Sequence, residues 1–160
     1  MMTVGGPLDP AFPDADIFVG APEPARVPPG RACAVARRYV DLINAGDYAG
    51  VAALYADDAS LLEPMRPGLH GRAQIDEFYS RRIGGMKPRL VATSILGDDV
   101  ECMIALALRV GIDGQERYAL VSVDHFQLDA QGRILSMTAF ARPPRTLPSQ
   151  AAPPFAAGQG

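Results

Sequence analysis

The sequence has few cysteines and little net charge, and each shortage argues against a class of protein. Its two cysteines, Cys33 and Cys102, have no paired spacing, no accompanying histidine cluster and no secretory context. They are therefore interpreted as small buried thiols in a reducing compartment. The formal net charge of the 160 residues is only −3, which does not favour a nucleic-acid-binding surface. We expect no nucleic-acid partner.

Long apolar runs are also missing. No run reaches the roughly 18 residues that a membrane-spanning helix needs, and the N-terminus lacks the basic and compact apolar regions of a secretory signal. The sequence thus predicts a cytoplasmic protein without a membrane partner. Because 48% of its residues are apolar, disorder of the whole chain is not expected either. Small apolar molecules become the favoured class of partner.

Proline is scarce in the middle of the chain. Only three of the 15 prolines lie between residues 30 and 143. We interpret residues 1–30 as a Pro-rich, flexible N-terminal tail in which Ile17 and Phe18 could dock loosely, and residues 143–160 as a Pro/Ala/Gly-rich C-terminal tail. Since 160 residues fit a single core, one domain over residues 31–142 remains.

Between the tails, apolar periodicity predicts helices followed by a meander of strands. The helices are expected over residues 32–43, ended by Gly46, then over 49–56, ended by Asp57-Asp58, and over 72–83, before Gly84-Gly85. The expected strands cover residues 60–63, 89–96, 101–110, 117–128 and 133–141, with hairpin turns at 112–114 and 129–132. This order indicates an α+β fold in which three helices cross one face of a curved antiparallel sheet and enclose a cone-shaped cavity.

Asp124 is the most unusual residue of the late strands, because aspartate is depleted in strands. Period-two alternation puts it on the more apolar face of its strand, which it shares with Leu120, Ser122, Phe126 and Leu128. A carboxyl group in such surroundings is expected to take up a proton and to act as a hydrogen-bond donor. The alternative is an aspartate near the end of a strand that is partly exposed or already hydrogen-bonded.

Tyr39 and Glu63 are two further candidates. Tyr39 lies in the centre of the first helix's apolar stripe, and its hydroxyl needs a partner, which the backbone or water could also supply. Glu63 follows a short apolar strand and precedes Pro64, which forces extended backbone, although a glutamate at a strand end is often simply solvated. The hydroxyls of Tyr55 and Tyr79, expected at the ends of the second and third helices, could form a chain with Tyr39 or belong to interface aromatics.

These residues lie in segments that resemble the bacterial ketosteroid isomerases over roughly residues 31–142. The segments are Arg38-Tyr-Val40 ahead of Asn44-Ala-Gly-Asp47, Ala53-Leu-Tyr-Ala-Asp-Asp-Ala59, Glu63-Pro64, His70-Gly-Arg-Ala-Gln-Ile75, Phe78-Tyr79 and Val123-Asp-His-Phe126. The most specific element is the order and joint spacing of Tyr39, Glu63 and Asp124. The resemblance implies a cone-shaped roll of three N-terminal helices on a curved antiparallel or mixed sheet, of the nuclear-transport-factor-2-like or SnoaL-like type, usually a homodimer and without a cofactor.

For the chemistry, the resemblance implies a steroid Δ5-isomerase, an intramolecular oxidoreductase that transposes a C=C bond of a 3-oxo-Δ5 steroid to the Δ4 position. Glu63 would be the general base, and Tyr39 and protonated Asp124 would form the oxyanion hole. A carboxylic acid kept neutral so that it can donate a hydrogen bond is a known feature of this family. The residues expected to bind the substrate or support the site are Tyr55, Tyr79, Phe126 and Met137.

The sequence departs from the family at the base, where the family usually carries aspartate. The extra methylene of Glu63 moves the carboxylate outward, and a displacement of about 1 Å can cost on the order of a hundredfold in rate. The pocket must compensate, the substrate must differ, or the activity must be lower. Small residues at Ala105, Ala107 and Ala141 could make the pocket roomier.

Two other classes of function stay open. One is another enzyme on the same fold, such as a polyketide cyclase, a dehydratase or an epoxide hydrolase, which would use different acids and bases. The other is a non-catalytic protein that binds steroids or similar apolar ligands. A metal site is not expected, because His70 and His125 have no suitable spacing with the carboxylates.

Overall fold

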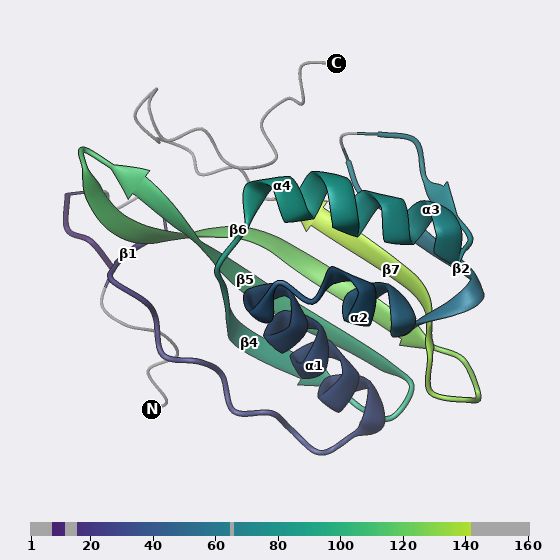
Figure 1. Cartoon of the computed structure of the whole chain (residues 1–160). Helices are drawn as coiled ribbons and strands as arrows, with labels where there is room; N and C mark the ends of the chain where they lie inside the picture. Colours follow the sequence, from purple (N-terminus) through teal and green to yellow (C-terminus); the bar gives the residue numbers. More distant parts are fainter. Residues whose placement is uncertain (1–7, 12–15, 65, 142–160) are drawn as a thin grey trace.

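The computed structural model describes residues 8–11, 16–64 and 66–141, and it has an α+β fold (Figure 1). Its elements in chain order are β1 (Ile17–Val19), α1 (Arg31–Ala45), α2 (Tyr48–Ala53), β2 (Tyr55–Leu62), β3 (Leu69–His70), α3 (Arg72–Glu77), the π-helical segment η1 (Phe78–Ile83), α4 (Gly84–Met86), β4 (Leu90–Gly97), β5 (Glu101–Ile112), β6 (Gln115–Leu128) and β7 (Ile134–Ala141). In this part of the chain, no helix is long and apolar enough to span a membrane.

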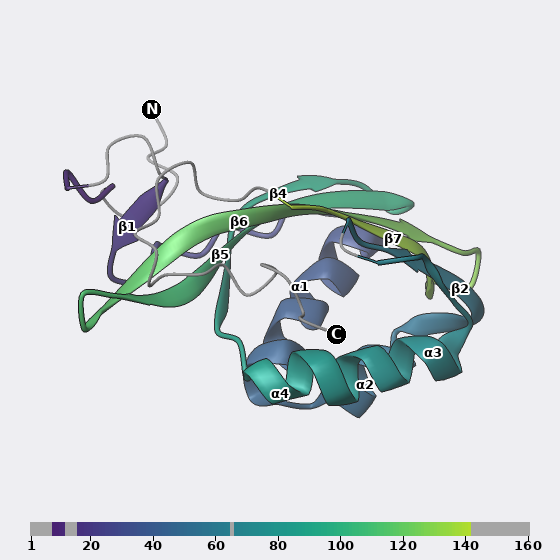
Figure 2. The ribbon, with the colours of Figure 1, turned by 90° about the horizontal axis from the view of Figure 1, so that it is seen from above.

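One curved sheet holds all seven strands. Its order is β3-β2-β7-β6-β5-β4, and β1 pairs with β6 off this path. The sheet is mixed, because β2 and β7 run parallel while β4, β5, β6 and β7 form an antiparallel meander. Figure 2 shows α1, α2 and the helix from α3 to α4 on one side of this sheet. The predicted packing of helices on one face of a curved sheet is confirmed.

The first helix agrees with its prediction. The apolar stripe of α1 is buried against the sheet, and Gly46 ends the helix in the left-handed conformation (φ 73°), with its N–H donating to the carbonyl of Ile43. Glycine adopts this conformation without the steric cost of a side chain. Cys33 of α1 and Cys102 of β5 are free and buried, as expected of small core thiols.

The second helix is shorter than predicted. α2 ends at Ala53, and β2 already begins at Tyr55, so Asp57 and Asp58 are exposed residues of a strand and not the end of a helix. Tyr55 pairs with Ile134 of β7, and sheet pairing of this kind overrides local helix propensity. The prediction that Tyr55 ends a helix is therefore wrong.

The third helix is longer than predicted. It continues from α3 through η1 into α4 and ends only at Met86, so Gly84-Gly85 does not terminate it. A Cβ at Gly84 would lie 3.2 Å from the ring of Tyr48, so this glycine serves close packing of the helix on α2. Tyr79 consequently lies inside the π-helical segment and not at a helix end, which corrects its predicted place.

A β-bulge changes which residues share the face of Asp124. The pairing of β5 with β6 shifts by one residue at Val121, and an extra residue of this kind reverses the alternation of side chains. Leu120 therefore packs with Phe18 and Tyr118, away from the cavity that Asp124 and Val121 line. The prediction that Leu120 shares a face with Asp124 is wrong for this reason.

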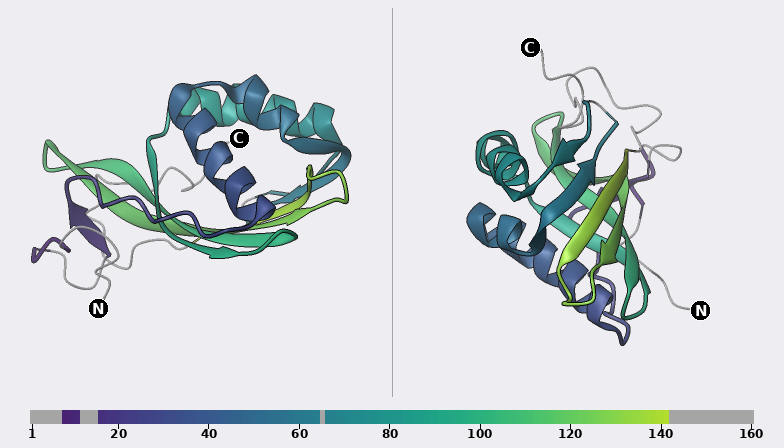
Figure 3. Two further views of the ribbon diagram at one scale, coloured as in Figure 1. Left: turned by 90° about the horizontal axis from the view of Figure 1, so that it is seen from below. Right: turned by 90° about the vertical axis from the view of Figure 1, so that its right-hand side faces the viewer.

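Part of the segment expected to be a flexible tail is an ordered strand. β1 pairs with β6 where Ile17 faces Ala119, and Ile17 is completely buried. An ion pair of 2.7 Å between Asp9 and Arg117 holds the preceding residues against the same strand. The left view in Figure 3 shows β1 beside the extended β5–β6 hairpin. Docking is thus tight and not loose. The predicted C-terminal tail lies outside the described residues.

Candidate active site

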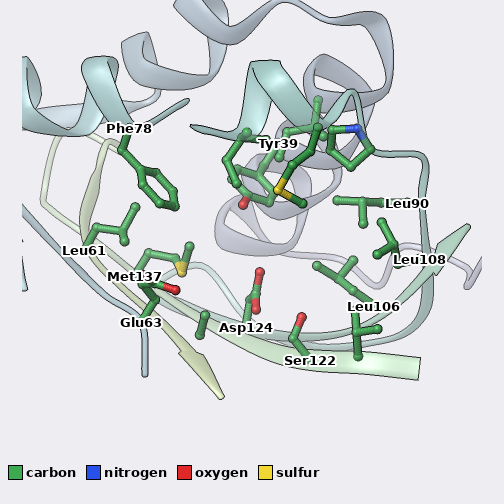
Figure 4. A pocket seen from close by; sticks show the side chains of 16 residues that line it. Tyr39, Leu61, Glu63, Phe78, Leu90, Leu106, Leu108, Ser122, Asp124 and Met137 are labelled. Atoms are coloured by element: carbon green, nitrogen blue, oxygen red, sulfur yellow. The ribbon is translucent and has the colours of Figure 1, made fainter. Parts of the chain in front are cut away.

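A cavity lies between the helices and the sheet, as the cone-shaped packing predicts (Figure 4). About 570 Å³ of space lies within it, part of which is open to solvent at its mouth. Its apolar walls are formed by Ile43, Leu61, Phe78, Ile83, Met86, Pro88, Leu90, Leu106, Leu108, Val121, Met137 and Ala139. Its polar side chains are Tyr39, Glu63, Ser122 and Asp124. An apolar ligand held by a few polar contacts fits such a lining.

Tyr39 projects from the centre of α1, and its hydroxyl is the end of a chain of tyrosines. The hydroxyl of Tyr79 donates to that of Tyr39 over 3.3 Å, and the hydroxyls of Tyr55 and Tyr79 lie 2.7 Å apart. Burial raises the pKa of all three tyrosines, so all stay protonated. Because Tyr39 accepts from Tyr79, its own proton remains available to an acceptor in the cavity.

Phe126 and Met137 occupy different places around Tyr39. Phe126 is completely buried and packs edge-on against the ring of Tyr39, with 5.1 Å between ring centroids. It supports the tyrosine from the sheet, whereas Met137 lines the cavity itself. Edge-on aromatic pairs of this kind fix ring orientation as well as adding stability.

Asp124 lies in the interior of β6, paired with Ile104 on one side and Ala139 on the other, and only 4% of its surface is exposed. Burial raises the pKa of Asp124 to about 7, and a hydrogen bond with Ser122 opposes this shift only in part. Burial thus favours the protonated form of this carboxyl group well above the pH at which an ordinary aspartate is ionised.

The carboxyl group of Asp124 also has unused hydrogen-bonding capacity. Its Oδ1 atom is buried and has no hydrogen-bond partner among the described residues, although buried polar atoms are almost always paired. Figure 4 shows this carboxyl group and the hydroxyl of Tyr39 pointing toward each other across the cavity. Their arrangement suits a ligand oxygen bound between them.

Glu63 follows directly after β2, at the side of the cavity where Leu61, Phe78 and Met137 lie (Figure 4). Only 4% of its side chain is exposed, and Oε1 lies 2.6 Å from Nε of Arg66. This ion pair is close but not aligned as a hydrogen bond, so within the described structure neither carboxylate oxygen has a hydrogen-bond partner. Glu63 is thus buried and not solvated, unlike the alternative that the sequence left open.

The predicted site residues come together in this one cavity or directly behind it, but sequence reasoning missed Arg66. This arginine follows Glu63 by three residues across Pro64, and its guanidinium lies 5.2 Å from the ring centroid of Phe78. The signal that could have found it is the spacing of opposite charges across a proline turn. No periodicity covers that turn, so the pairing was not evident.

The predicted small residues do not enlarge the cavity. Ala105 and Ala107 lie on the other face of β5, because their neighbours Leu106 and Leu108 point into the cavity. Ala141 pairs with Ser122 at the end of β7 and is not part of the lining. The expectation of a roomier pocket from these alanines is wrong.

The histidines lie apart from this cavity. His70 is on β3 beside Ser60, and His125 lies 2.9 Å from Glu101. In the ranges that the structure describes, no group of three or more His, Cys, Asp or Glu side chains could hold a metal ion.

Comparison with known proteins gives matches to a family model and to individual proteins. The model of the SnoaL-like domain matches residues 36–137. A protein named Steroid Delta-isomerase from Nocardioides simplex is 39% identical over 113 residues, which are 69% of this chain and 89% of that protein.

Two solved structures share the fold. The epoxide hydrolase/cyclase-like enzyme SalBIII, which has a role in pyran ring formation in the polyether salinomycin, has a TM-score of 0.58 at 21% identity, over 68% of this chain and 88% of that one. A Mycobacterium tuberculosis protein in complex with estradiol-17β-hemisuccinate has a TM-score of 0.59 at 18% identity, over 69% and 93%. At such identities, likeness speaks for the fold alone. The match of the family model to residues 36–137 places this chain in the SnoaL-like family, and the solved structures show its nuclear-transport-factor-2-like fold.

Proposed function

We propose that the protein is a steroid Δ5-isomerase, which moves the C=C bond of a 3-oxo-Δ5 steroid to the Δ4 position. The observation that carries this proposal is the apolar cavity that holds the hydroxyl of Tyr39 together with the buried carboxyl groups of Glu63 and Asp124. The 39% identity to a protein named Steroid Delta-isomerase supports the same reaction.

Glu63 is the general base. It removes a proton from C4, between the ketone and the C5–C6 double bond, and the electron pair moves to the ketone oxygen to form a dienolate. The same carboxyl group then returns the proton to C6, and the double bond ends between C4 and C5. One carboxylate thus carries one proton between two carbons, so the reaction needs no cofactor or metal.

Tyr39 and Asp124 form the oxyanion hole. Negative charge develops on the ketone oxygen when the proton leaves C4, and fixed donors aimed at that oxygen are usually the largest catalytic contribution. The proton of Tyr39 is available because Tyr79 donates to its oxygen. Asp124 donates in its neutral form, which its burial favours. Tyr55 and Tyr79 act behind Tyr39 and do not touch the substrate.

We also propose that the protein is a homodimer. The face of the sheet opposite the helices carries apolar side chains that are exposed in the single chain, namely Leu62, Leu96, Met103 and Phe140. Exposed apolar residues gathered on one face of a sheet are typical of a protein interface. Leu96 and Met103 are register partners on β4 and β5, so they form one continuous part of this surface.

The test is the ultraviolet absorbance of the protein mixed with a 3-oxo-Δ5 steroid, followed over time for the conjugated enone. We expect the band to grow with the parent protein, and Glu63→Gln to lower turnover by at least about a hundredfold while steroid binding persists. The amide keeps the shape of the side chain but cannot take the proton.

Other results would identify a different function. Saturable steroid binding without growth of the band would indicate a binding protein. Turnover of an epoxide or a hydroxy acid, with none of the unsaturated ketone, would indicate another enzyme on this fold. Turnover that Glu63→Gln leaves unchanged would remove Glu63 from the mechanism.

A further inference from the structure

The glutamate at position 63 poses a geometric problem that its surroundings address. A side chain one methylene longer than aspartate reaches farther from the backbone by roughly 1.5 Å, the length of one carbon–carbon bond. The carboxylate of Glu63 does not extend freely into the cavity, because Oε1 lies 2.6 Å from Nε of Arg66. The longer side chain of Glu63 thus ends against a cation, Arg66, on the turn that follows β2.

Arg66 is itself held in place. Its guanidinium lies over the ring of Phe78, 5.2 Å from the centroid, at a distance typical of a cation–π contact. Phe78 begins η1 and lines the cavity, and its ring packs edge-on against that of Tyr79 at 5.1 Å. The guanidinium is thus fixed between the helix side of the cavity and the carboxylate.

Arg66 contacts the carboxylate from outside the cavity. It does not line the cavity, and 29% of its side chain is exposed, whereas the side chain of Glu63 is 4% exposed. A buried carboxylate needs a partner for its charge. Arg66 approaches Oε1, whereas Oε2 has no hydrogen-bond partner among the described residues.

We propose that Arg66 is a positioning residue that holds the carboxylate of Glu63 at the distance from the substrate at which it can accept the proton. Arg66 draws Oε1 back against the turn and so takes up the extra methylene, and it supplies the countercharge for the ionised base. This inference rests on the proposed isomerase function and deepens it. Glu63 and Arg66 then act as a matched pair, in which the longer acid needs the cation.

The pair is tested by replacing Arg66 in two backgrounds. In the parent, Arg66→Met is expected to lower kcat by about tenfold or more, with KM changed by less than about twofold, because the base is displaced while the apolar cavity persists. In Glu63→Asp, the shorter acid would lie about 4 Å from Arg66, beyond a close ion pair, so adding Arg66→Met is expected to lower kcat by less than about threefold.

Two further variants keep the test specific. Arg66→Lys restores a cation within reach of the carboxylate and is expected to recover most of the kcat that Arg66→Met loses. Arg81→Met is the matched control. Arg81 of η1 forms an exposed ion pair with Glu77, and the loss of this pair is expected to leave kcat unchanged. Exposed pairs of that kind contribute little.

The outcomes separate this inference from the function on which it rests. An active parent with equal kcat losses from Arg66→Met in both backgrounds, or with no loss in either, would overturn the positioning role alone. A kcat that Arg66→Lys fails to recover would also contradict it. A parent without isomerase activity would overturn the proposed function, and the inference with it.

Discussion

At the scale of single residues, the cavity contains polar groups in an environment that stability alone does not favour. Asp124 is buried with one carboxyl oxygen unpaired, and Glu63 is buried with a close but poorly aligned partner. Uncompensated burial of such groups costs free energy of folding. Sites that hold polar groups at such a cost are typical places of function.

The protonation of Asp124 predicts how activity depends on pH. Only the neutral carboxyl group can donate to the ketone oxygen, and the pKa of Asp124 is raised to about 7. As pH rises through about 7, the group loses its proton, and kcat/KM is expected to fall, because kcat/KM reports the ionisation of the free enzyme. The measurement is the pH profile of kcat/KM from about two units below that value to about two units above it.

Asp124→Asn and Asp124→Leu are the controls for this profile. The amide of Asn donates at every pH, so the fall of kcat/KM above pH 7 should disappear. Leu donates at no pH, and the loss of one oxyanion donor should lower kcat by about a hundredfold or more. An unchanged fall in Asp124→Asn would show that another group titrates and that Asp124 is not the donor.

At the scale of elements, the strand β1 packs behind residues that line the cavity. Ile17 packs with Leu108 and Val121, two residues that line the cavity. β1 and β7 lie along the same edge of β6. β1 pairs with residues 117–119, and β7 pairs with residues from Ser122 onward. The N-terminal segment thus continues the sheet behind one end of the cavity.

This packing predicts that Ile17 contributes to the stability of the fold. Ile17→Ala is expected to lower the free energy of unfolding by about 2 to 4 kcal/mol, as for other completely buried isoleucines. Val19→Ala at the exposed end of the same strand is the matched control, with an expected change within about 0.5 kcal/mol. Urea unfolding measures both. Equal, small effects would mean that β1 does not dock on the sheet in solution.

The elements also show how far the sequence predicts the structure. Strong periodicity located α1 and the strands of the meander, because their apolar residues face one core. The ends of α2 and α3 were misplaced, since pairing of Tyr55 with Ile134 and packing of Gly84 on Tyr48 arise from tertiary contacts. The bulge at Val121 and the docking of Ile17 also depend on partners distant in the sequence.

Within the site, spacing and resemblance predicted that Tyr39, Glu63 and Asp124 belong to one site. The structure places all three around one cavity. Their proposed roles in catalysis are still predictions. Arg66 was missed because a turn has no periodicity to reveal what its side chains contact. Contacts between a turn and a distant helix, such as that of Arg66 with Phe78, appear only in three dimensions.

At the scale of the whole molecule, the fold separates three tasks. The curved sheet and the helices enclose an apolar cavity; in the proposed mechanism Tyr39 and Asp124 are its two donors, and Glu63, paired with Arg66, is its base. A substrate filling this cavity would exclude water from the base. A shielded carboxyl group should return the proton that it took instead of exchanging it with solvent.

The most direct measurement is therefore the fate of deuterium placed at C4 of a 3-oxo-Δ5 steroid, read by nuclear magnetic resonance of the product. We predict that most product molecules carry deuterium at C6, and that Glu63→Gln forms almost no product. Product that carries only solvent hydrogen at C6 would contradict a single, shielded carboxylate as the carrier of the proton.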